Sequence, residues 1–331
     1  MRPAVSQPLP RATVSGGGIQ APTTGAQGQA IRRVEDLRGE RRETQEGNRT
    51  VIREPDRTII RENGRTIIRH NEVDRFRADA RDVRTERQGR ETTTIIERPD
   101  GSRIVTVTDD DGRLLRRSRR GRDNREVIII DNRYRGGPEM RESYYVDLPP
   151  PVIRIPRQRY ILEAEHASPN DVYEVLSAPP VERIDRRYTL DEIRYSPRVR
   201  ERMPRVDVDT ITFELGSWEI TPDQIDRLAV VAEGIKRAVA ANPAEVFLIE
   251  GHTDATGGDD DNLSLSDRRA ETVALALTEK FEVPAENLTT QGYGEQYLKV
   301  DTQAAERQNR RVSARRITPL LSGDQTSGQV R

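Results

Sequence analysis

Two charged side chains, Asp254 and Arg269, stand out in the stretch 251–270, which reads GHTDATGGDDDNLSLSDRRA. A carboxylate can accept hydrogen bonds from an ammonium group, and a planar guanidinium can pair with a carboxylate through two parallel hydrogen bonds. If the fold brings the two side chains to opposite sides of one cleft, they can hold a ligand that is itself a zwitterion. The pair therefore predicts a binding site for a group that carries both an ammonium and a carboxylate.

The surrounding sequence predicts a strand, a loop and a helix that position this pair. Residues 246–249 form a short apolar run typical of a buried strand, and Asp254 follows it. A Gly-rich acidic loop comes next. The helix after it is indicated by apolar residues at helical spacing, namely Ala270, Val273, Ala274, Leu277 and Phe281. Such a turn can fold Arg269 back to face Asp254.

The same residues also have ordinary structural interpretations. Asp254 could cap the following helix, and Arg269 could be a helix-surface charge paired with Asp267 or Glu250. The acidic run 259–261 could suggest calcium, but acids are favourable in the first turn of a helix, and we interpret the run in that way.

The order of these residues is similar to that of a known family. The pattern TDxxG…NxxLSxxRA is matched by Thr253-Asp254, Gly257, Asn262, Leu265-Ser266 and Arg269-Ala270, and it is followed by Gly292-Tyr293-Gly294-Glu295 and Asn309-Arg310-Arg311-Val312. This resembles the OmpA-like peptidoglycan-binding domain, found at the C-terminus of outer-membrane porins, peptidoglycan-associated lipoproteins and flagellar stator proteins. Three ordered motifs are more specific than one short pattern. The resemblance covers roughly residues 207–321.

The resemblance implies a ligand and a place. The ligand is peptidoglycan, and the group held is the diaminopimelate of its stem peptide, a zwitterion at its side-chain centre. By resemblance Asp254 accepts from the ammonium and Arg269 pairs with the carboxylate. Thr253, Asn262 and Arg310 are further ligand-binding candidates. The implied protein is a non-enzymatic cell-envelope protein of the periplasm or outer membrane, without a cofactor, that tethers the envelope to the cell wall. No nucleophile with a positioned base is evident in the sequence.

The predicted fold class is α+β. The C-terminal domain is expected to be a β-α-β-α-β-β sandwich with a mixed sheet, preceded by an Arg-rich β-hairpin region and by disordered or linker segments. Its elements are expected as strands at 211–213, 246–250, 288–291 and 311–317, a helix opened by a capping box at 221–224, the helix bearing Arg269, and a short helical piece near Ala304.

An internal repeat of period eight precedes this domain. Six β-prone residues followed by a two-residue turn recur from Arg49, Arg57 and Arg65, and they predict successive hairpins with Asn63-Gly64 as the strongest turn. A longer version covers 91–117, and another strand is expected at 127–130. Short charged helices are expected between 31 and 46 and between the two repeat groups. We interpret the repeats as a solvated stalk or spacer; a partner-binding platform and a nucleic-acid contact are the alternatives.

The chain divides into five expected parts. Helix starts at Ser168, Thr189 and Ser196 follow the proline run 149–151. The parts are a disordered leader (1–30), the charged β-hairpin repeat region (31–145), a Pro-rich linker with an accessory helical region (146–206), the OmpA-like domain (207–321) and a disordered tail (322–331).

Composition narrows the possible functions. Only 33% of the 331 residues are hydrophobic and 34% are charged, so part of the chain cannot bury a dense core. Basic and acidic residues number 55 and 56, which argues against a nucleic-acid partner. Cysteine is absent, which excludes disulfides. No apolar run reaches the length of a transmembrane helix, which disfavours a motor stator. The alternative function is an envelope scaffold that acts through residues 31–145, by a protein partner or by self-association.

Overall fold

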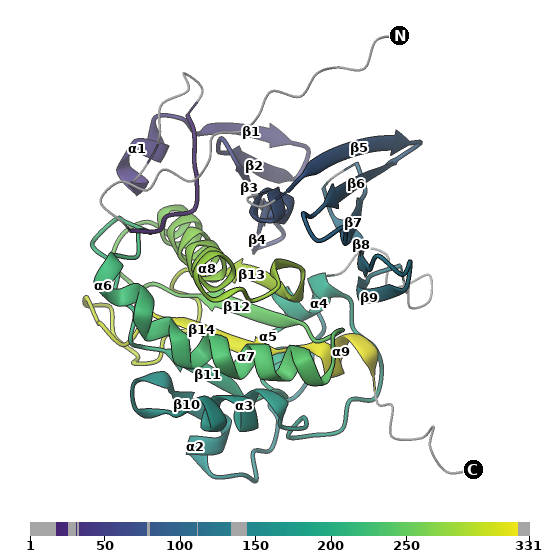
Figure 1. Ribbon diagram of the computed structural model, residues 1–331. Helices are drawn as coiled ribbons and strands as arrows, with labels where there is room; N and C mark the ends of the chain where they lie inside the picture. The colour runs from purple at the N-terminus through teal and green to yellow at the C-terminus, as the bar shows by residue number, and fades with distance from the viewer. Residues whose placement is uncertain are drawn as a thin grey trace.

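In the residues that the structure describes, the protein consists of three β-sheets and the helices packed on them (Figure 1). The computed structural model describes residues 18–25, 31, 33–77, 80–110, 112–133 and 144–323. Most of the expected leader and tail lies outside the described residues. Residues 18–25 are an exception to the expected disordered leader, because Ile19 is buried and exchanges two backbone hydrogen bonds with Ile220.

The period-eight repeat forms a four-stranded antiparallel sheet, as the hairpin pattern predicts. At the turn between its last two strands, Asn63 and Gly64 have φ values of 52° and 71°. Positive φ at both central residues is the conformation for which Asn-Gly is favoured in hairpins. The helix expected between 31 and 46 is limited to α1 (Val34–Arg38), and the polar sequence after it forms an additional strand. The strands are β1 (Arg42–Glu46), β2 (Arg49–Arg53), β3 (Arg57–Glu62) and β4 (Arg65–His70).

The longer repeat forms a second antiparallel sheet of five strands in sequential order. The helix expected between the two sheets is a 3₁₀ helix, η1 (Glu72–Arg77), and Val83 already belongs to the next strand. The strand expected at 127–130 is confirmed. The strands are β5 (Asp82–Gln88), β6 (Glu91–Glu97), β7 (Arg103–Thr108), β8 (Leu114–Arg120) and β9 (Glu126–Asp131).

The third sheet is mixed and belongs to the C-terminal domain, which confirms the predicted fold class. Its strand order is β10-β11-β14-β12-β13, with β14 antiparallel to both neighbours and β12 parallel to β13. The bounds are β10 (Ile161–Glu163), β11 (Arg205–Val208), β12 (Phe247–Gly251), β13 (Leu288–Gly292) and β14 (Val312–Arg316). Helices α7 and α8 cover one face of this sheet (Figure 1). On or beside that face lie α3 (Pro169–Ser177), α6 (Pro222–Ile225), η4 (Asp226–Leu228), α7 (Ala229–Ala241), α8 (Asp259–Phe281) and η5 (Ala285–Asn287).

Two predicted elements of this domain are wrong. No strand forms at 211–213, because the Thr212 backbone N–H donates to the Gln224 side chain at 2.6 Å rather than to a neighbouring strand. The strand in that place is β11, a few residues earlier. No helix forms near Ala304, where the Asn309 side chain instead closes a loop by accepting from the backbone N–H groups of Lys299 and Val300.

Residues 184–203 of the accessory region cover the other face of the mixed sheet. Val246 and Leu248 pack there against Leu190, Ile193 and other apolar side chains of the region. The helix starts predicted at Ser168 and Thr189 are confirmed as capping boxes. The remaining helices are α2 (Arg157–Tyr160), η3 (Ala164–His166), α4 (Leu190–Tyr195), α5 (Pro197–Arg200) and α9 (Thr318–Ser322). The accessory region therefore supplies a second core beneath the sheet.

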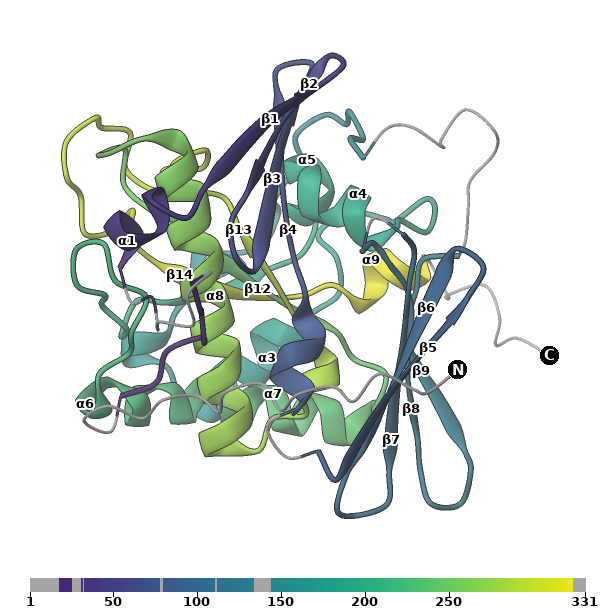
Figure 2. The ribbon, with the colours of Figure 1, turned by 90° about the horizontal axis from the view of Figure 1, so that it is seen from above.

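The first sheet is packed against α8, so the interpretation of the repeats as a solvated stalk is wrong. Ile52, Ile59 and Ile68 form a buried cluster with Leu263 of α8, and burying one such side chain stabilises by about 1.5–3 kcal/mol. Seen from above, β1–β4 lie beside α8, and β5–β9 lie farther along, near α4 and α9 (Figure 2). The face of β2, β3 and β4 that carries these isoleucines thus finds a partner that the repeat itself does not reveal.

Two glycines let α8 approach the mixed sheet closely. Gly251 and Gly292 are paired in register at the ends of β12 and β13. A Cβ atom on Gly251 would stand 1.9 Å from the Ser266 carbonyl oxygen, and one on Gly292 would stand 2.3 Å from the Asp267 nitrogen. The first half of α8 is therefore fixed directly above the strand ends from which the candidate ligand-binding loop departs.

Candidate functional site

The loop after β12 carries Asp254 and is fixed by backbone hydrogen bonds to two neighbouring loops. The backbone N–H of His252 donates to Arg311 and that of Thr253 donates to Gly294, each at 2.9 Å. Asp254 itself is only 4% exposed. The strand end and its two backbone contacts thus fix the carboxylate in place, as the strand-loop prediction requires.

The Asp254 carboxylate already has polar partners. One oxygen accepts from the backbone N–H and the hydroxyl of Thr256, at 3.2 and 2.5 Å, and the other accepts from Arg310 Nη1 at 2.6 Å. Burial works against ionisation of this group, but the hydrogen bonds from Thr256 and Arg310 outweigh it and hold the pKa of Asp254 below its usual range. Asp254 is therefore an anion at neutral pH.

Arg269 is held by carbonyl groups rather than by a carboxylate. Its Nε donates to the Ser217 carbonyl at 3.0 Å and its Nη2 to the Glu214 carbonyl at 3.1 Å. We call residues 214–217 the acceptor loop. The ring of Phe213 lies 4.8 Å from the guanidinium carbon, and Arg269 is 2% exposed. Among the residues that the structure describes, no carboxylate forms an ion pair with it.

The surroundings of Arg269 lower its pKa. Burial is the largest cause, the positive charge of Arg310 adds to it, and Asp254 acts in the opposite direction, with a resulting pKa of about 9. The three charged groups therefore lie within electrostatic reach of one another. A buried guanidinium without a carboxylate partner is costly unless an anion compensates it, which makes Arg269 the most distinctive feature of this site.

The two ordinary pairings considered for Arg269 do not occur. Asp267 pairs with Arg57 at 2.8 Å, and Glu250 pairs with Arg315 at 3.2 Å. Both carboxylates point to other parts of the protein. Arg269 is thus separate from the ion pairs that stabilise the fold.

Asn262 ties the acidic loop to the motif that follows β13. Its side-chain N–H groups donate to the Thr256 carbonyl at 3.1 Å and to Glu295 at 2.7 Å. Gly257, with φ of 105°, allows the backbone to turn between Thr256 and Asn262. Thr253 is buried, and its hydroxyl has no hydrogen-bond partner within the described part of the chain. The structure therefore brings Thr253, Asp254, Asn262 and Arg310 to one place, with Arg269 beside it.

Sequence reasoning missed part of the site. Glu295, which fixes Asn262, lies in a motif that was recognised, so its role could have been inferred from that motif. The sequence of the acceptor loop contains no motif from which its contact with Arg269 could be inferred. Its neighbour Phe213 has the pattern of a strand residue, and the contact with Arg269 spans more than fifty positions.

The acidic run 259–261 lies in the first turn of α8, as expected. Asp261 pairs with Arg38 and Arg41, and Asp260 pairs with Arg61. In the described ranges, no group of three or more His, Asp or Glu side chains is arranged to hold a metal ion. Nor does any described helix have the length and apolar character needed to cross a membrane.

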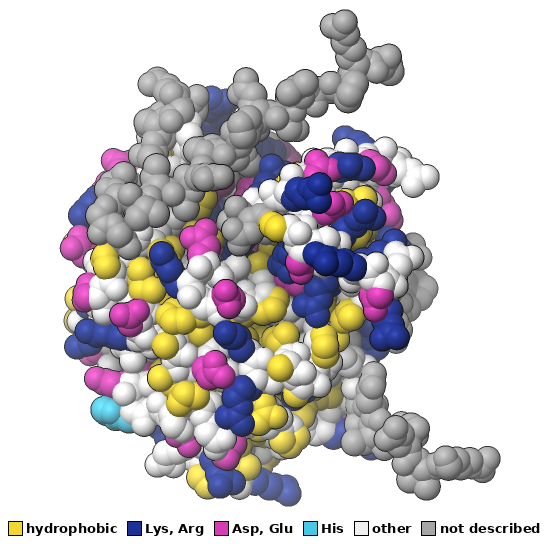
Figure 3. Space-filling model, viewed as in Figure 1, with side chains coloured by type: hydrophobic (Ala, Val, Ile, Leu, Met, Phe, Trp, Pro, Cys, Tyr) yellow, Lys and Arg dark blue, Asp and Glu magenta, His cyan; other side chains and the backbone are white. Residues whose placement is uncertain are grey.

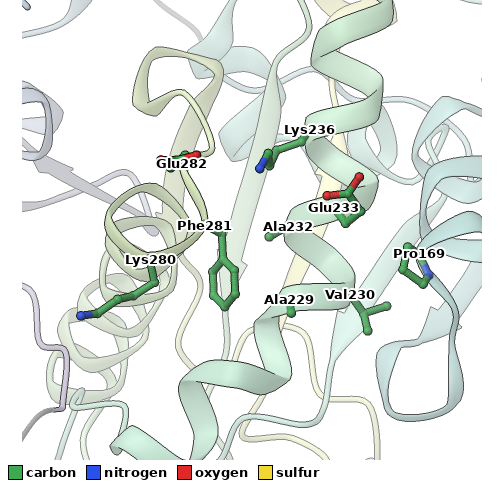
Figure 4. A pocket seen from close by; sticks show the side chains of 9 residues that line it. All are labelled: Pro169, Ala229, Val230, Ala232, Glu233, Lys236, Lys280, Phe281 and Glu282. Carbon is green, nitrogen blue, oxygen red and sulfur yellow. The ribbon is translucent and has the colours of Figure 1, made fainter.

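A separate pocket of about 420 Å³ lies at the other end of α8 (Figure 4). The Phe281 ring points between α8 and α7, and Lys236 extends from α7 toward it. With a rise of about 1.5 Å per residue, the 23 residues of α8 place this pocket roughly 30 Å from the first turn of that helix. It is therefore not part of the site around Asp254.

The chain matches known sequences over its C-terminal third. The model of the OmpA family matches residues 212–312. The putative lipoprotein YfiB of Escherichia coli (strain K12) is 32% identical over 113 residues, which are 34% of this chain and 68% of that protein. The probable lipoprotein YiaD of the same organism is 36% identical over 114 residues, 34% of this chain and 49% of YiaD.

The outer-membrane lipoprotein YfiB of Pseudomonas aeruginosa is 36% identical over 96 residues, which are 28% of this chain and 54% of that protein. Among solved structures, the peptidoglycan-associated lipoprotein from Burkholderia pseudomallei is 26% identical with a TM-score of 0.26, over 32% of this chain and 86% of that one. The OmpA-like domain of FopA1 from Francisella tularensis is 20% identical with a TM-score of 0.28, over 34% and 70%.

The region shared with these relatives contains the site described above. The chain spans about two thirds of the first relative's length and about half the length of YiaD and of the second YfiB. The family match includes Asp254, Arg269 and Arg310, together with the acceptor loop. This chain therefore belongs to the OmpA family.

Proposed function

We propose that the protein binds peptidoglycan non-covalently through the site around Asp254 and Arg269. The observation that carries the proposal is the buried Arg269 guanidinium, which has no carboxylate partner among the described residues and is already oriented by two backbone carbonyl groups. A ligand carboxylate supplies the missing anion. Membership of the OmpA family supports peptidoglycan as the polymer that carries it.

The group bound is proposed to be diaminopimelate of the stem peptide. Its ammonium is assigned to Asp254 and its carboxylate to Arg269, since the two charges lie close together and are both fixed by the backbone. Thr253 offers an unsatisfied hydroxyl for a further hydrogen bond. Asn262 holds the loop through Thr256 and Glu295. Arg310 pairs with Asp254, and in this proposal the ligand ammonium replaces Arg310 at that carboxylate.

We propose a binding role without catalysis. His70, Thr290 and Asp267 are arranged like a hydroxyl nucleophile with a histidine base and a carboxylate. The Nε2 of His70 lies 2.9 Å from the Thr290 hydroxyl, and its Nδ1 lies 2.8 Å from Asp267. Burial alone lowers the pKa of this histidine, but Asp267 and Glu271 outweigh it and raise the pKa to about 9. A ring that is protonated at neutral pH is not a general base, and Thr290 is fully buried beneath the first sheet.

The proposed location is the periplasm, at the outer membrane. The name of one relative, the outer-membrane lipoprotein YfiB of Pseudomonas aeruginosa, supports this assignment. Nucleic acid is not proposed as a partner. On the face shown in Figure 3, basic and acidic side chains are interspersed rather than gathered into a basic patch, and a nucleic-acid contact needs such a patch.

The decisive test is co-sedimentation of the full chain with purified sacculi. We expect wild type to pellet, and Asp254→Asn and Arg269→Gln each to lose about tenfold or more in affinity, because each removes one charge-assisted interaction. Asp123→Asn and Arg125→Gln are matched controls, since they remove the same two charges from an exposed pair on the second sheet. Equal binding by all five proteins would contradict the proposal.

Competition with small amino-acid compounds tests the assignment of the ligand. Meso-diaminopimelate carries the ammonium and the carboxylate at its side-chain centre, whereas Nα-acetyl-lysine amide, in which the α-amino and α-carboxyl groups are blocked, carries only the side-chain ammonium. We expect diaminopimelate to release the protein from sacculi and the blocked lysine at the same concentration to leave it bound. Equal release by both compounds would mean that Arg269 does not recognise the carboxylate.

A second candidate function is a scaffold role for residues 31–145. The observation that favours it is that β1 and β5 each leave one edge unpaired within the described residues, and an extended segment of a partner or of a second copy can pair with such an edge. Sedimentation equilibrium of wild type and Thr85→Pro tests self-association through β5. A monomeric wild type would exclude it.

A further inference from the structure

The N-terminal segment, residues 33–41, contacts the acceptor loop through its backbone. Arg33 forms an antiparallel bridge with Ser217. The backbone N–H of Val34 donates to the Gly216 carbonyl at 2.9 Å. This part of the N-terminal segment therefore forms backbone hydrogen bonds with the acceptor loop, whose carbonyl groups also hold Arg269.

The other end of the N-terminal segment contacts the first turn of α8. Arg38 donates to Asp261 from Nε at 2.8 Å and from Nη2 at 2.5 Å, and Arg41 forms a second ion pair with the same carboxylate. Arg41 is also paired with Glu54 at 2.8 Å. Asp261 immediately precedes Asn262, the residue that ties the acidic loop together. The segment thus reaches the Asp254 side of the site.

Between these ends, the N-terminal segment is anchored in a small core of its own. Leu37 is fully buried, and Val34 and Leu37 pack with Trp218 and with Leu265 of α8. Trp218 directly follows the acceptor loop, and its indole N–H donates to the Ala21 carbonyl at 3.2 Å. The apolar contacts therefore connect the same two elements as the polar contacts do.

We propose that the N-terminal segment is a positioning brace for the ligand site. It joins the acceptor loop, which orients Arg269, to the first turn of α8, which orients the Asp254 loop, without contacting the ligand. Holding two charged groups at a fixed separation lowers the entropic cost of binding a ligand that must contact both. This inference rests on the proposed function, because it concerns the geometry of that same site.

The brace implies that the part of the chain needed for full binding affinity is longer than the region matched by the family. The family match begins at residue 212, and the fragment 207–321 contains the acceptor loop and α8 but not the segment that joins them. The unit that binds with full affinity therefore includes residues 33–41. For this reason the tests use the full chain.

The first test removes the negative charge of Asp261, with which both Arg38 and Arg41 pair. We expect Asp261→Asn to weaken sacculus binding by about fivefold through loss of preorganisation, with an unchanged circular dichroism spectrum. Asp259→Asn is the matched control, because it changes the same charge in the same helical turn at a residue that has no ion pair within the described ranges. Equal affinities of the two variants and wild type would overturn the proposal.

The second test fixes the acceptor-loop end of the brace covalently. The chain has no cysteine, so Arg33→Cys with Ser217→Cys gives a single possible disulfide. Paired residues of antiparallel backbone have Cα separations of about 4.5–5.5 Å, which suits a disulfide. In the otherwise unchanged chain, we expect oxidation of this pair to raise the affinity for sacculi above that of the reduced form of the same protein, and reduction to reverse the gain.

The outcomes separate this inference from the proposed function. If wild type itself does not bind sacculi, the proposed function fails. If wild type binds and oxidation weakens binding relative to the reduced form, the segment must move away for the ligand to enter, and the brace is wrong. If oxidation has no effect on affinity, the brace is also wrong, even where Asp261→Asn is poorly folded.

Discussion

Arg310 Nη1 lies 2.6 Å from Oδ2 of Asp254, so the carboxylate assigned to a ligand ammonium is paired with a cation of the chain itself. The arginine is one-third exposed whereas the carboxylate is almost fully buried. If a ligand ammonium replaces Arg310 at Asp254, the arginine is thus the group that moves. Its guanidinium competes with the ligand for the same oxygen atom.

Replacing Arg310 should therefore strengthen binding. A partly exposed ion pair is worth at most about 1 kcal/mol, so we expect Arg310→Gln to raise the affinity for sacculi by about two- to fivefold. A co-sedimentation titration of the full chain measures the change. A loss of affinity as large as that of Asp254→Asn would show that Arg310 contacts the ligand directly.

Arg269 should contribute to binding at the expense of stability. We expect Arg269→Met to reduce sacculus binding by about tenfold or more, while its free energy of unfolding stays within about 1 kcal/mol of wild type, because loss of two hydrogen bonds is offset by removal of an uncompensated buried charge. Urea unfolding and co-sedimentation of the same protein samples measure both quantities. A stability loss of several kcal/mol would instead assign Arg269 to the core.

The buried ion pair between Arg57 and Asp267 should be important for stability. Removing one member of a buried pair typically costs about 3–5 kcal/mol, and we expect this loss for Arg57→Ala. Arg49 occupies the equivalent position of the preceding repeat but forms an exposed pair with Glu46. Arg49→Ala should therefore cost less than about 1 kcal/mol. Similar losses for both variants in urea unfolding would contradict the assigned difference.

His70 should make stability depend on pH. Because its pKa is raised to about 9 in the folded protein from an ordinary value of 6.5, its contribution is fully present below pH 6.5 and is lost as pH rises to about 9. We expect the free energy of unfolding to fall by up to roughly 3 kcal/mol across this window. His70→Gln should flatten the profile, whereas His166→Gln, at an exposed position, should not. Identical profiles for wild type and His70→Gln would refute this.

Short-range pattern was sufficient to predict the strand that Asp254 follows and the helix that carries Arg269. Strand length, turn type and helix starts follow from neighbouring residues, as at Asn63-Gly64 and Ser168, because local backbone preferences and local hydrogen bonds determine them. The position of Asp254 after a buried strand and of Arg269 on the following helix follows from the same local rules. The sequence by itself therefore determined which residues are candidates for the ligand.

Only the tertiary structure decided which equivalent residues are buried and what they contact. Arg49, Arg57 and Arg65 begin successive repeats, yet only Arg57 is buried, against Asp267 at a separation of 210 positions. In the same way, the pairing of Arg310 with Asp254 and the packing of the first sheet on α8 join distant parts of the chain. Burial and ion pairing depend on which surfaces meet, and a repeat that presents similar faces at every strand carries no local signal of which face will be covered.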